Sequence, residues 1–362
     1  MKILVISNYR AEHSTRPEAE IFVGLAKRGV EVDIMTFGDT KHLEKFNNAG
    51  INIIDFNPKK RLGKDDISFI RNHLIEGKHD IIQLYNSRAI LNGLQAAKNL
   101  PVKIVLYRGC VGDIHWYDPV AYFKFLHPRV DKIVCNSRGV EDSIQKQLFF
   151  DKSKTITINK GHRLAWYEDV EAAPIKKEFD LPEDAFVLVN VANNRRMKGI
   201  PYLLEAMNLL PSGLPIYLLL IGNNMDTKSN LSLISKGSYE DNVQFIGFRE
   251  DALSIVAAAD VFASSSISGE SITKSIIEAM ALGVAPIITD IPGNVELCNH
   301  EESGLIVKSK NAKELSDAIL RLYNDRGLCS LLGKNAKSRI GTFLNTDKTI
   351  KEMKKLYDSL LA

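Results

Sequence analysis

Short apolar runs rich in β-branched residues alternate with helical stretches along the whole chain. In the first half such runs predict six strands, at residues 2–6, 31–36, 51–56, 80–85, 102–107 and 131–136. Between them, residues 17–29 and 91–100 have the apolar spacing of helices, with Pro17 suited to a first helical turn and Gly29 to a C-cap. Near-continuous apolar strands are typical of a parallel sheet that is covered on both faces. The first half therefore predicts a repeated strand–helix–strand unit.

The same alternation starts again after residues 172–184, a charged stretch with two prolines that we interpret as a linker. Six further runs predict strands, at residues 185–192, 215–222, 242–247, 260–265, 284–289 and 304–307. We therefore expect an α/β protein with two tandem, doubly wound, Rossmann-like parallel-sheet domains, divided near residue 170. Ligands of such sheets bind outside the carboxyl ends of the strands, so a central cleft between two facing sheets is the expected site.

Length and composition agree with two soluble domains. The chain has 362 residues, more than the roughly 250 to 300 at which a single hydrophobic core stops growing. Its content of 45% apolar and 25% charged residues is ordinary, and no segment is of low complexity. The first residues are too short an apolar run for a signal peptide, and no stretch reaches 18 apolar residues, so we expect a cytoplasmic protein. The four cysteines have neither disulfide nor metal spacing.

Charge is shared unevenly between the halves. Residues 1–168 hold 26 Lys plus Arg against 19 Asp plus Glu, a balance of +7, whereas residues 169–362 hold 21 against 25, a balance of −4. A basic half favours contact with anionic lipid headgroups or with a phosphorylated acceptor. A solvated surface of mixed charge explains the excess equally well.

Several nucleotide-binding motifs are absent. The loop after the first predicted strand, S-N-Y-R-A-E-H-S-T-R, contains no glycine, so the G-x-G-x-x-G cradle of NAD and FAD enzymes is missing. The chain has no G-x-x-x-x-G-K-[ST] motif and no Asp-x-Asp pair to hold a divalent ion against a diphosphate. These absences argue against kinases and metal-dependent transferases, and we expect no metal and no nucleic acid as partners.

Two features of the second half predict an anion site. Arg195, Arg196 and Lys198 lie in the turn N-N-R-R-M-K-G that follows a strand, beside a helix start. Guanidinium and ammonium groups at a positive helix end suit a diphosphate, although a solvated basic turn is the alternative. After the strand at 260–265, the segment E-S-I-T-K-S-I-I-E-A-M-A places Glu270 before a helix that we expect to begin near Thr273, with its backbone N–H groups as a second anion seat.

The second acid of that segment, Glu278, would lie about 7.5 Å further along the helix axis, at 1.5 Å per residue. A nucleotide diphosphate at the helix start would then have its ribose near Glu278 and its sugar near Glu270. The two acids would accept hydrogen bonds from hydroxyl groups. The alternative is that both acids lie on a solvated helix face.

Together these motifs resemble those of the retaining glycosyltransferases of family 4, which have the two-domain GT-B fold. The resemblance covers nearly the whole chain and rests on R-R-M-K-G, F-I-G-F, E-S-I-T-K-S-I-I-E-A-M-A, G-V-A-P-I-I-T and G-L-I-V. It implies that Lys198 with Arg195 or Arg196 neutralises the donor diphosphate, that Glu270 binds the donor sugar, and that Glu278 binds the ribose. The remaining donor contacts implied are Ser271, Ile272, Thr273 and Lys274 beside the sugar and Ile246, Gly247 and Phe248 beside the base.

The chain departs from the family pattern at two places. Where the family commonly has E-G-F-G, this chain has E-S-I-T, so Ser271 and Thr273 add side chains beside the sugar and Lys274 adds a charge. In the first domain a histidine often found after the fifth strand is replaced by Arg108, a candidate contact for an anion or sugar. His115, a few residues on, and Arg16, placed just before the first predicted helix, are further candidates, each with a surface or packing role as the alternative.

The resemblance implies metal-independent transfer of a sugar from a nucleotide-diphosphate sugar to an acceptor hydroxyl, with retained configuration. Residues 1–170 would bind the acceptor, residues 171–344 the donor, and the last helix, 345–362, would return to the first domain. The implied acceptor is a glycan or lipid-linked molecule of bacterial surface polysaccharide or lipopolysaccharide synthesis, reached at the inner face of the membrane. A sugar-nucleotide 2-epimerase of the same fold and a non-catalytic sugar-nucleotide binding protein are the alternatives.

Overall fold

The computed structural model describes residues 1–149 and 151–362. Within these residues the chain forms two compact units. The first unit is Met1–His162 together with Leu344–Ala362, and the second unit is Arg163–Phe343. The stretch 172–184, interpreted above as a linker, belongs to the second unit, because helix α6 (Ile175–Glu178) lies within it and Ile175 is buried.

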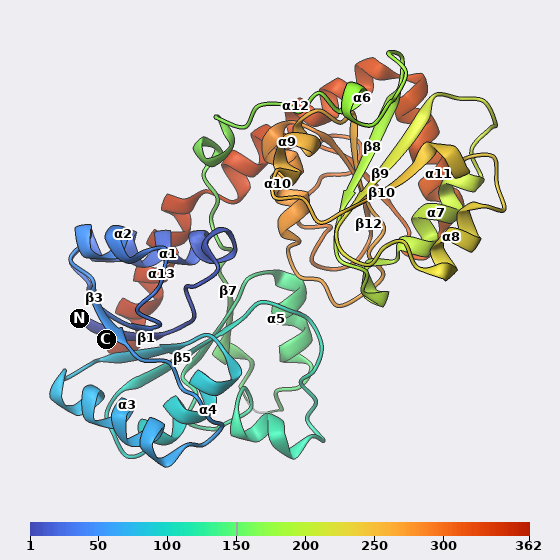
Figure 1. Cartoon of the computed structure of the whole chain (residues 1–362). Helices are drawn as coiled ribbons and strands as arrows, with labels where there is room; N and C mark the ends of the chain where they lie inside the picture. Colours follow the sequence, from blue (N-terminus) through green and yellow to red (C-terminus); the bar gives the residue numbers. More distant parts are fainter. Residues whose placement is uncertain (150) are drawn as a thin grey trace. The chain divides into compact units, whose positions relative to one another are not determined.

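The first unit contains a seven-stranded parallel sheet in the order β3-β2-β1-β4-β5-β6-β7 (Figure 1). Its strands are β1 (Lys2–Ile6), β2 (Glu31–Thr36), β3 (Asn52–Asp55), β4 (Ile81–Leu84), β5 (Lys103–Arg108), β6 (Lys132–Cys135) and β7 (Thr155–Thr157). Its helices are α1 (Glu12–Ala26), α2 (Leu43–Asn48), α3 (Lys64–Glu76), α4 (Ser87–Ala96), α5 (Arg138–Gln145) and α13 (Thr346–Leu361), with short 3₁₀ helices η1 (Pro119–Phe123) and η2 (Lys152–Lys154). The six predicted strands are present, and the three-residue β7 adds one that was not predicted.

Side chains alternate between the two faces of this sheet, as the period of a strand requires. On β1, Ile3 and Val5 belong to the apolar cluster formed with α1 and α13, whereas Leu4 and Ile6 belong to the cluster formed with α3, α4 and α5. All four side chains are fully buried. Cover on both faces explains why the strands are apolar throughout and do not alternate with polar residues.

Helix α1 begins earlier than predicted. The first helical turn starts at Glu12, where Thr15 N donates to Ala11 O at 3.1 Å, and Pro17 lies inside the helix. The prediction from Pro17 was wrong because a proline near a helix start deprives only one carbonyl, that of His13, of its partner, and His13 is exposed to water. Arg16 therefore lies within α1 and not before it.

The chain end completes the first unit. Helix α13 packs on α1, where a Cβ built at Gly24 would lie 2.2 Å from Ile350 Cδ1, so the glycine lets the two helices lie in direct contact. The Thr349 hydroxyl donates to Asn159 O at 2.8 Å. The outgoing and returning segments run side by side, because His162 N donates to Leu344 O at 2.6 Å.

The second unit contains a six-stranded parallel sheet in the order β10-β9-β8-β11-β12-β13. Its strands are β8 (Phe186–Val191), β9 (Ile216–Ile221), β10 (Val243–Gly247), β11 (Val261–Ser264), β12 (Ala285–Thr289) and β13 (Leu305–Val307). Its remaining helices are η3 (Leu164–Tyr167), η4 (Arg196–Lys198), α7 (Ile200–Asn208), α8 (Lys228–Ile234), η5 (Glu240–Asn242), α9 (Ala252–Ala257), α10 (Lys274–Leu282), α11 (Ala312–Asn324) and α12 (Arg326–Phe343). All six strands predicted for the second half are present.

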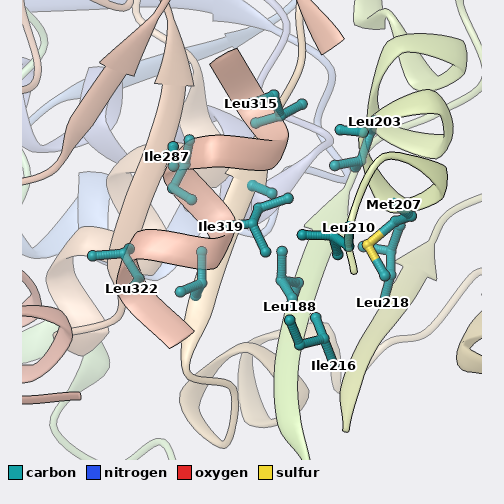
Figure 2. Packing of buried hydrophobic residues seen from close by; sticks show 14 of the residues in the cluster. Leu188, Leu203, Met207, Leu210, Ile216, Leu218, Ile287, Leu315, Ile319 and Leu322 are labelled. Atoms are coloured by element: carbon teal, nitrogen blue, oxygen red, sulfur yellow. The ribbon is translucent and has the colours of Figure 1, made fainter. Parts of the chain in front are cut away.

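The core on one face of this sheet is built from aliphatic side chains of α7, α11 and the strands beneath them. Figure 2 shows Leu203 of α7 and Ile319 of α11 directed toward the strand residue Leu188, and all three are fully buried. Truncating one such side chain to alanine typically costs about 2 to 5 kcal/mol. This rigid core fixes the carboxyl ends of β8 and β11, from which the site residues project.

Candidate active site

The two loops that carry the predicted cations and the first predicted acid are joined in the structure. Strands β8 and β11 are neighbours, and each loop follows the carboxyl end of one of them. Ile267 N donates to Met197 O at 2.7 Å, and the Ser265 hydroxyl donates to Lys198 O at 3.0 Å. These bonds hold the basic turn and the acidic loop in one fixed arrangement.

Gly199 makes this close approach possible. Its φ is +64°, and a Cβ built on it would lie 2.1 Å from the carbonyl oxygen of Ser265. A side chain would therefore need an unfavourable backbone conformation and would overlap the neighbouring loop. The glycine that ends the R-R-M-K-G turn is thus required by packing between loops.

Lys198 and Glu270 form an ion pair at the centre of this arrangement. Lys198 Nζ lies 2.5 Å from Glu270 Oε1, and the side chains are only 17% and 13% exposed. The angles at this contact lie outside those of a hydrogen bond, so Oε1 has an ionic partner but no aligned donor within the described residues. An ion pair of this kind leaves the carboxylate oxygen able to accept a hydrogen bond from a hydroxyl group of a ligand.

A buried hydroxyl and a buried amide support the other oxygen of this acid. Thr273 Oγ1 lies 3.3 Å from Glu270 Oε2 and 2.7 Å from Asn294 Oδ1, and Asn294 is completely buried. Asn294 Nδ2 has no partner among the described residues, so turning the amide over gives Thr273 a donor in place of an acceptor. The single Thr273 proton is then available to Glu270, which makes a chain Asn294 to Thr273 to Glu270.

Glu278 is also paired with a lysine, here through a hydrogen bond as well as an ion pair. Helix α10 begins at Lys274 with Thr273 as its N-cap residue, so Glu270 lies in the loop and Glu278 in the second turn, as the sequence predicted. Lys274 Nζ lies 2.5 Å from Glu278 Oε1, an i,i+4 pair in which the lysine side chain is 42% exposed. The lysine that departs from the family pattern thus neutralises the acid expected to bind ribose.

The other candidates of the second unit lie around these pairs. Arg195 and Arg196 are exposed, and neither guanidinium makes an ion pair or hydrogen bond within residues 1–149 and 151–362. Ile246 and Gly247 lie at the carboxyl end of the edge strand β10, and the Phe248 side chain is 66% exposed.

Two residues of the segment after Glu270 lie deeper. Ser271 is buried, and Gly293 approaches its backbone so closely that a Cβ there would lie 2.3 Å from the Ser271 carbonyl. Ile272 is partly buried.

The structure separates the candidates of the first unit. Arg108 donates through Nε to Cys110 O at 2.9 Å and through a terminal nitrogen to Gly112 O, so its guanidinium folds its own loop. It also lines a hollow of about 410 Å³ with Tyr85 and Tyr107. His115 is exposed, stacks on Tyr117 with ring centroids 5.0 Å apart, and does not line this hollow.

A charged pair that the sequence did not predict lies close to the rings of Tyr85 and Tyr107, which line that hollow. Lys160 Nζ lies 2.9 Å from Glu18 Oε2, Ser7 Oγ donates to Glu18 Oε1 at 2.6 Å, and the ammonium lies 4.2 Å from the centre of the Tyr107 ring. Burial lowers the pKa of Lys160, but Glu18 and Tyr107 raise it by more, so the net pKa lies above its ordinary value and the amine stays charged. Residues 142 positions apart gave no sequence signal for this pair.

Two features are absent from the described residues. No group of three or more His, Cys, Asp and Glu side chains there is placed to hold a metal ion. None of the helices built from those residues has the length and apolar content needed to cross a membrane.

Two doubly wound parallel sheets, each with polar groups at its carboxyl edge, give the chain the architecture of the GT-B fold. The family model described as "Glycosyl transferases group 1" matches residues 172–339, and the model described as "Glycosyltransferase Family 4" matches residues 19–165. Together the two models match most of the chain, which therefore belongs to glycosyltransferase family 4.

Curated relatives are distant. An uncharacterized glycosyltransferase of Methanocaldococcus jannaschii is 28% identical over 244 residues, 66% of this chain and 61% of that protein. The N,N'-diacetylbacillosaminyl-diphospho-undecaprenol alpha-1,3-N-acetylgalactosaminyltransferase of Campylobacter jejuni is 27% identical, over 66% of this chain and 62% of its own length. The matched segments thus span about three fifths of these two relatives. The capsular polysaccharide glycosyltransferase CapM of Staphylococcus aureus is 25% identical over 93% of this chain and 92% of its own.

Solved structures share the fold. A glycosyltransferase from Rickettsia africae superposes with a TM-score of 0.82 at 19% identity, covering 99% of this chain and 98% of that one. The Anabaena protein HepE, in complex with UDP, superposes with a TM-score of 0.78 at 19% identity, covering 99% of this chain and 100% of HepE. At this level of identity the likeness establishes the architecture of both units.

Proposed function

We propose that this enzyme transfers a sugar from a nucleotide-diphosphate sugar to an acceptor hydroxyl, with retention of the anomeric configuration and without a metal ion. The observation that carries the proposal is the Lys198–Glu270 pair, held by two hydrogen-bonded loops at the carboxyl ends of adjacent strands. In this proposal the second unit binds the donor and the first unit binds the acceptor.

The donor diphosphate would take Lys198 as its partner in place of Glu270. The exposed guanidinium of Arg195 or Arg196 and the amino end of α10 would add to the same positive field. Negative charge grows on the diphosphate as the glycosidic bond breaks. Fixed cations aimed at it therefore stabilise the transition state more than the bound donor. Leaving-group stabilisation would therefore supply most of the rate enhancement.

The acids and the edge of the sheet would orient the rest of the donor. Glu270, released from Lys198 but still held through Thr273, would accept hydrogen bonds from sugar hydroxyls. Glu278 would accept from the ribose once its contact with Lys274 opens. Phe248, exposed at the end of β10, would offer a ring face to the base.

The biological setting is proposed from the relatives. The Campylobacter relative is named for a diphospho-undecaprenol substrate, CapM for capsular polysaccharide, and HepE was crystallised with UDP. We infer that this chain builds a bacterial surface polysaccharide or lipopolysaccharide from a nucleotide sugar. A lipid-linked acceptor would bring it to the inner face of the membrane, where its basic first half would meet anionic headgroups.

A screen of nucleotide sugars by thermal shift tests the donor, because a ligand that binds the folded state raises the melting temperature. The best stabiliser is then incubated with EDTA-treated enzyme, once alone and once with candidate acceptors. Transfer that needs an acceptor and survives EDTA supports the proposal. Conversion of the donor without acceptor would instead identify an epimerase, and failure of every nucleotide sugar to stabilise the protein would contradict the donor site.

A further inference from the structure

A second hollow lies at the carboxyl edge of the first sheet, apart from the one beside Arg108. It has a volume of about 340 Å³ and spans the ends of four consecutive strands, β3, β2, β1 and β4. One residue that follows each of these strands lines it, in the same order Asn57, Phe37, Asn8 and Asn86. The crevice where the strand order reverses, between β1 and β4, is the usual ligand site of such a sheet.

This hollow carries uncompensated positive charge. Arg61 and Arg88 line it, both are exposed, and neither guanidinium forms an ion pair or hydrogen bond in the described part of the chain. No carboxylate is among its described lining residues.

A neighbouring hollow shows the contrast. Its volume is about 790 Å³, and three aspartates and three lysines line it, so the formal charges of its lining residues balance. Asp66 there also accepts hydrogen bonds from the backbone N–H groups of Lys59 and Lys60. Arg61 and Arg88 have no such partners, so an anion entering their hollow need not displace an internal acid.

Further donors surround the two arginines. The hydroxyl of Ser87 is inaccessible to solvent and has no partner among the described residues. The Asn86 amide oxygen caps the ten-residue helix α4 by accepting hydrogen bonds from Arg88 N and Ala89 N. The NH₂ group of the same amide then remains as a donor for a ligand. The positive end of α4 lies at the same place.

Ser87 also lines the hollow of Tyr85 and Tyr107, so the two hollows meet at this residue. One side of Ser87 offers guanidinium groups and amides, and the other offers aromatic rings and the side chain of Ile90. A ligand that spans both carries an anion at one end and a sugar ring or an apolar group at the other.

We propose that Arg61 and Arg88 bind a phosphate-class anion of the acceptor, and that Tyr85 and Tyr107 contact the group attached to it. This inference rests on the proposed function, because it assigns the acceptor of that reaction. It names a sugar phosphate or a prenyl diphosphate as the acceptor class, and it makes the two arginines determinants of acceptor specificity.

The test is a calorimetric titration of pyrophosphate into the full chain. Because pyrophosphate also suits the donor site, the titration is made in Lys198→Ala, which weakens that site. In the Lys198→Ala background, Arg61→Gln and Arg88→Gln should each weaken pyrophosphate binding about tenfold, which corresponds to the free energy of one charged hydrogen bond. The matched control is Lys98→Gln, which removes one exposed charge just beyond the other end of α4.

Two further ligands distinguish the sources of the anion. A sugar 1-phosphate and farnesyl diphosphate are titrated into the same variants, with a neutral methyl glycoside as the uncharged reference. If the phosphate is the group recognised, each arginine substitution should lower the affinity for both anions about tenfold. Loss for farnesyl diphosphate alone would specify a lipid-linked acceptor, and loss for the sugar phosphate alone a soluble one.

The proposal is overturned if pyrophosphate does not bind in Lys198→Ala, or if its affinity is the same with and without Arg61 and Arg88. An equal loss of affinity for the neutral glycoside would also overturn it, because the arginines would then determine the shape of the hollow and would not recognise the charge of the ligand. These readings do not depend on a nucleotide sugar. Failure of the donor screen and failure of this titration therefore remain separate results.

Discussion

The carboxyl edges of the two sheets differ in how their charges are compensated. In the second unit, Lys198 and Lys274 each lie 2.5 Å from a glutamate of the candidate donor site. In the first unit, Arg61 and Arg88 line a hollow without an acid among its described lining residues. An anion that binds Lys198 or Lys274 must exchange with an existing ion pair, whereas an anion that binds Arg61 and Arg88 meets no such pair among the described residues.

The difference predicts different kinds of selectivity. Exchange with an acid costs part of the binding energy, so a bare anion should bind at Lys198 less tightly than a ligand whose sugar or ribose also satisfies the released carboxylate. An unopposed pair of guanidinium groups binds a bare anion and loses affinity with added salt. We therefore expect the second unit to select whole nucleotide sugars and the first unit to select charge.

The largest effect is expected from opposite changes to the Lys198–Glu270 pair. Lys198→Ala should lower the rate of transfer about 10²- to 10³-fold, because a fixed cation at the leaving group is lost, and should weaken nucleotide diphosphate binding as well. Glu270→Ala should slow transfer comparably but leave free nucleotide diphosphate bound as tightly as before or more tightly, because Lys198 is released. Steady-state kinetics and calorimetry measure both, with Lys313→Ala on α11 as the control; equal losses of nucleotide affinity would refute the assigned roles.

The next effect tests the contact that joins the two loops. Gly199→Ala should lower the free energy of unfolding by about 3 kcal/mol, because a strained φ and an overlap with Ser265 O add together. Gly213 has a similar φ of +79° but no atom within 4 Å of a built Cβ, so Gly213→Ala should cost about 1 kcal/mol. Denaturant unfolding compares the two, and equal costs would show that the loops do not need this close approach.

A smaller effect is expected at Thr273. Thr273→Val removes the hydroxyl beside Glu270 and should lower kcat about fivefold, the worth of roughly 1 kcal/mol, while the affinity for nucleotide diphosphate stays the same. Thr273→Ser keeps the hydroxyl and should restore kcat. A valine variant with unchanged kcat would mean that the chain from Asn294 does not position the acid.

The smallest effect concerns Lys274. Lys274→Gln frees Glu278 from a half-exposed i,i+4 pair worth about 0.3 to 0.5 kcal/mol and should tighten nucleotide binding about twofold. Lys313→Gln breaks the equivalent pair with Asp317 on α11 and should leave nucleotide binding unchanged. Weaker binding in Lys274→Gln would show that the lysine contacts the ligand directly.

The sequence predicted most of the architecture because the strands are covered on both faces. Buried strands such as β2, predicted at 31–36 and observed at Glu31–Thr36, are apolar along their whole length and therefore easy to bound. The helix start after Glu270 was predicted correctly from the segment E-S-I-T-K. Strand β7 was missed because Thr-Ile-Thr is too short to show a period.

Contacts between distant residues could not be predicted in the same way. Asn294 reaches Thr273 only because the loop after β12 folds back over the start of α10, and no local pattern reports that return. Asparagines do follow three of the four strands β3, β2, β1 and β4, at Asn57, Asn8 and Asn86. That recurrence at strand ends was the one available signal for the hollow of Arg61 and Arg88.

The return of α13 to the first unit has a consequence for synthesis on the ribosome. Side chains that close the apolar face of α1, among them Ile350 and Tyr357, are made only after the whole second unit, which is complete once Phe343 has emerged. Although domains made first generally fold first, here the first unit must wait until α13 has been made. A chain that stopped at Phe343 would have a finished second unit and an unsealed, aggregation-prone first unit.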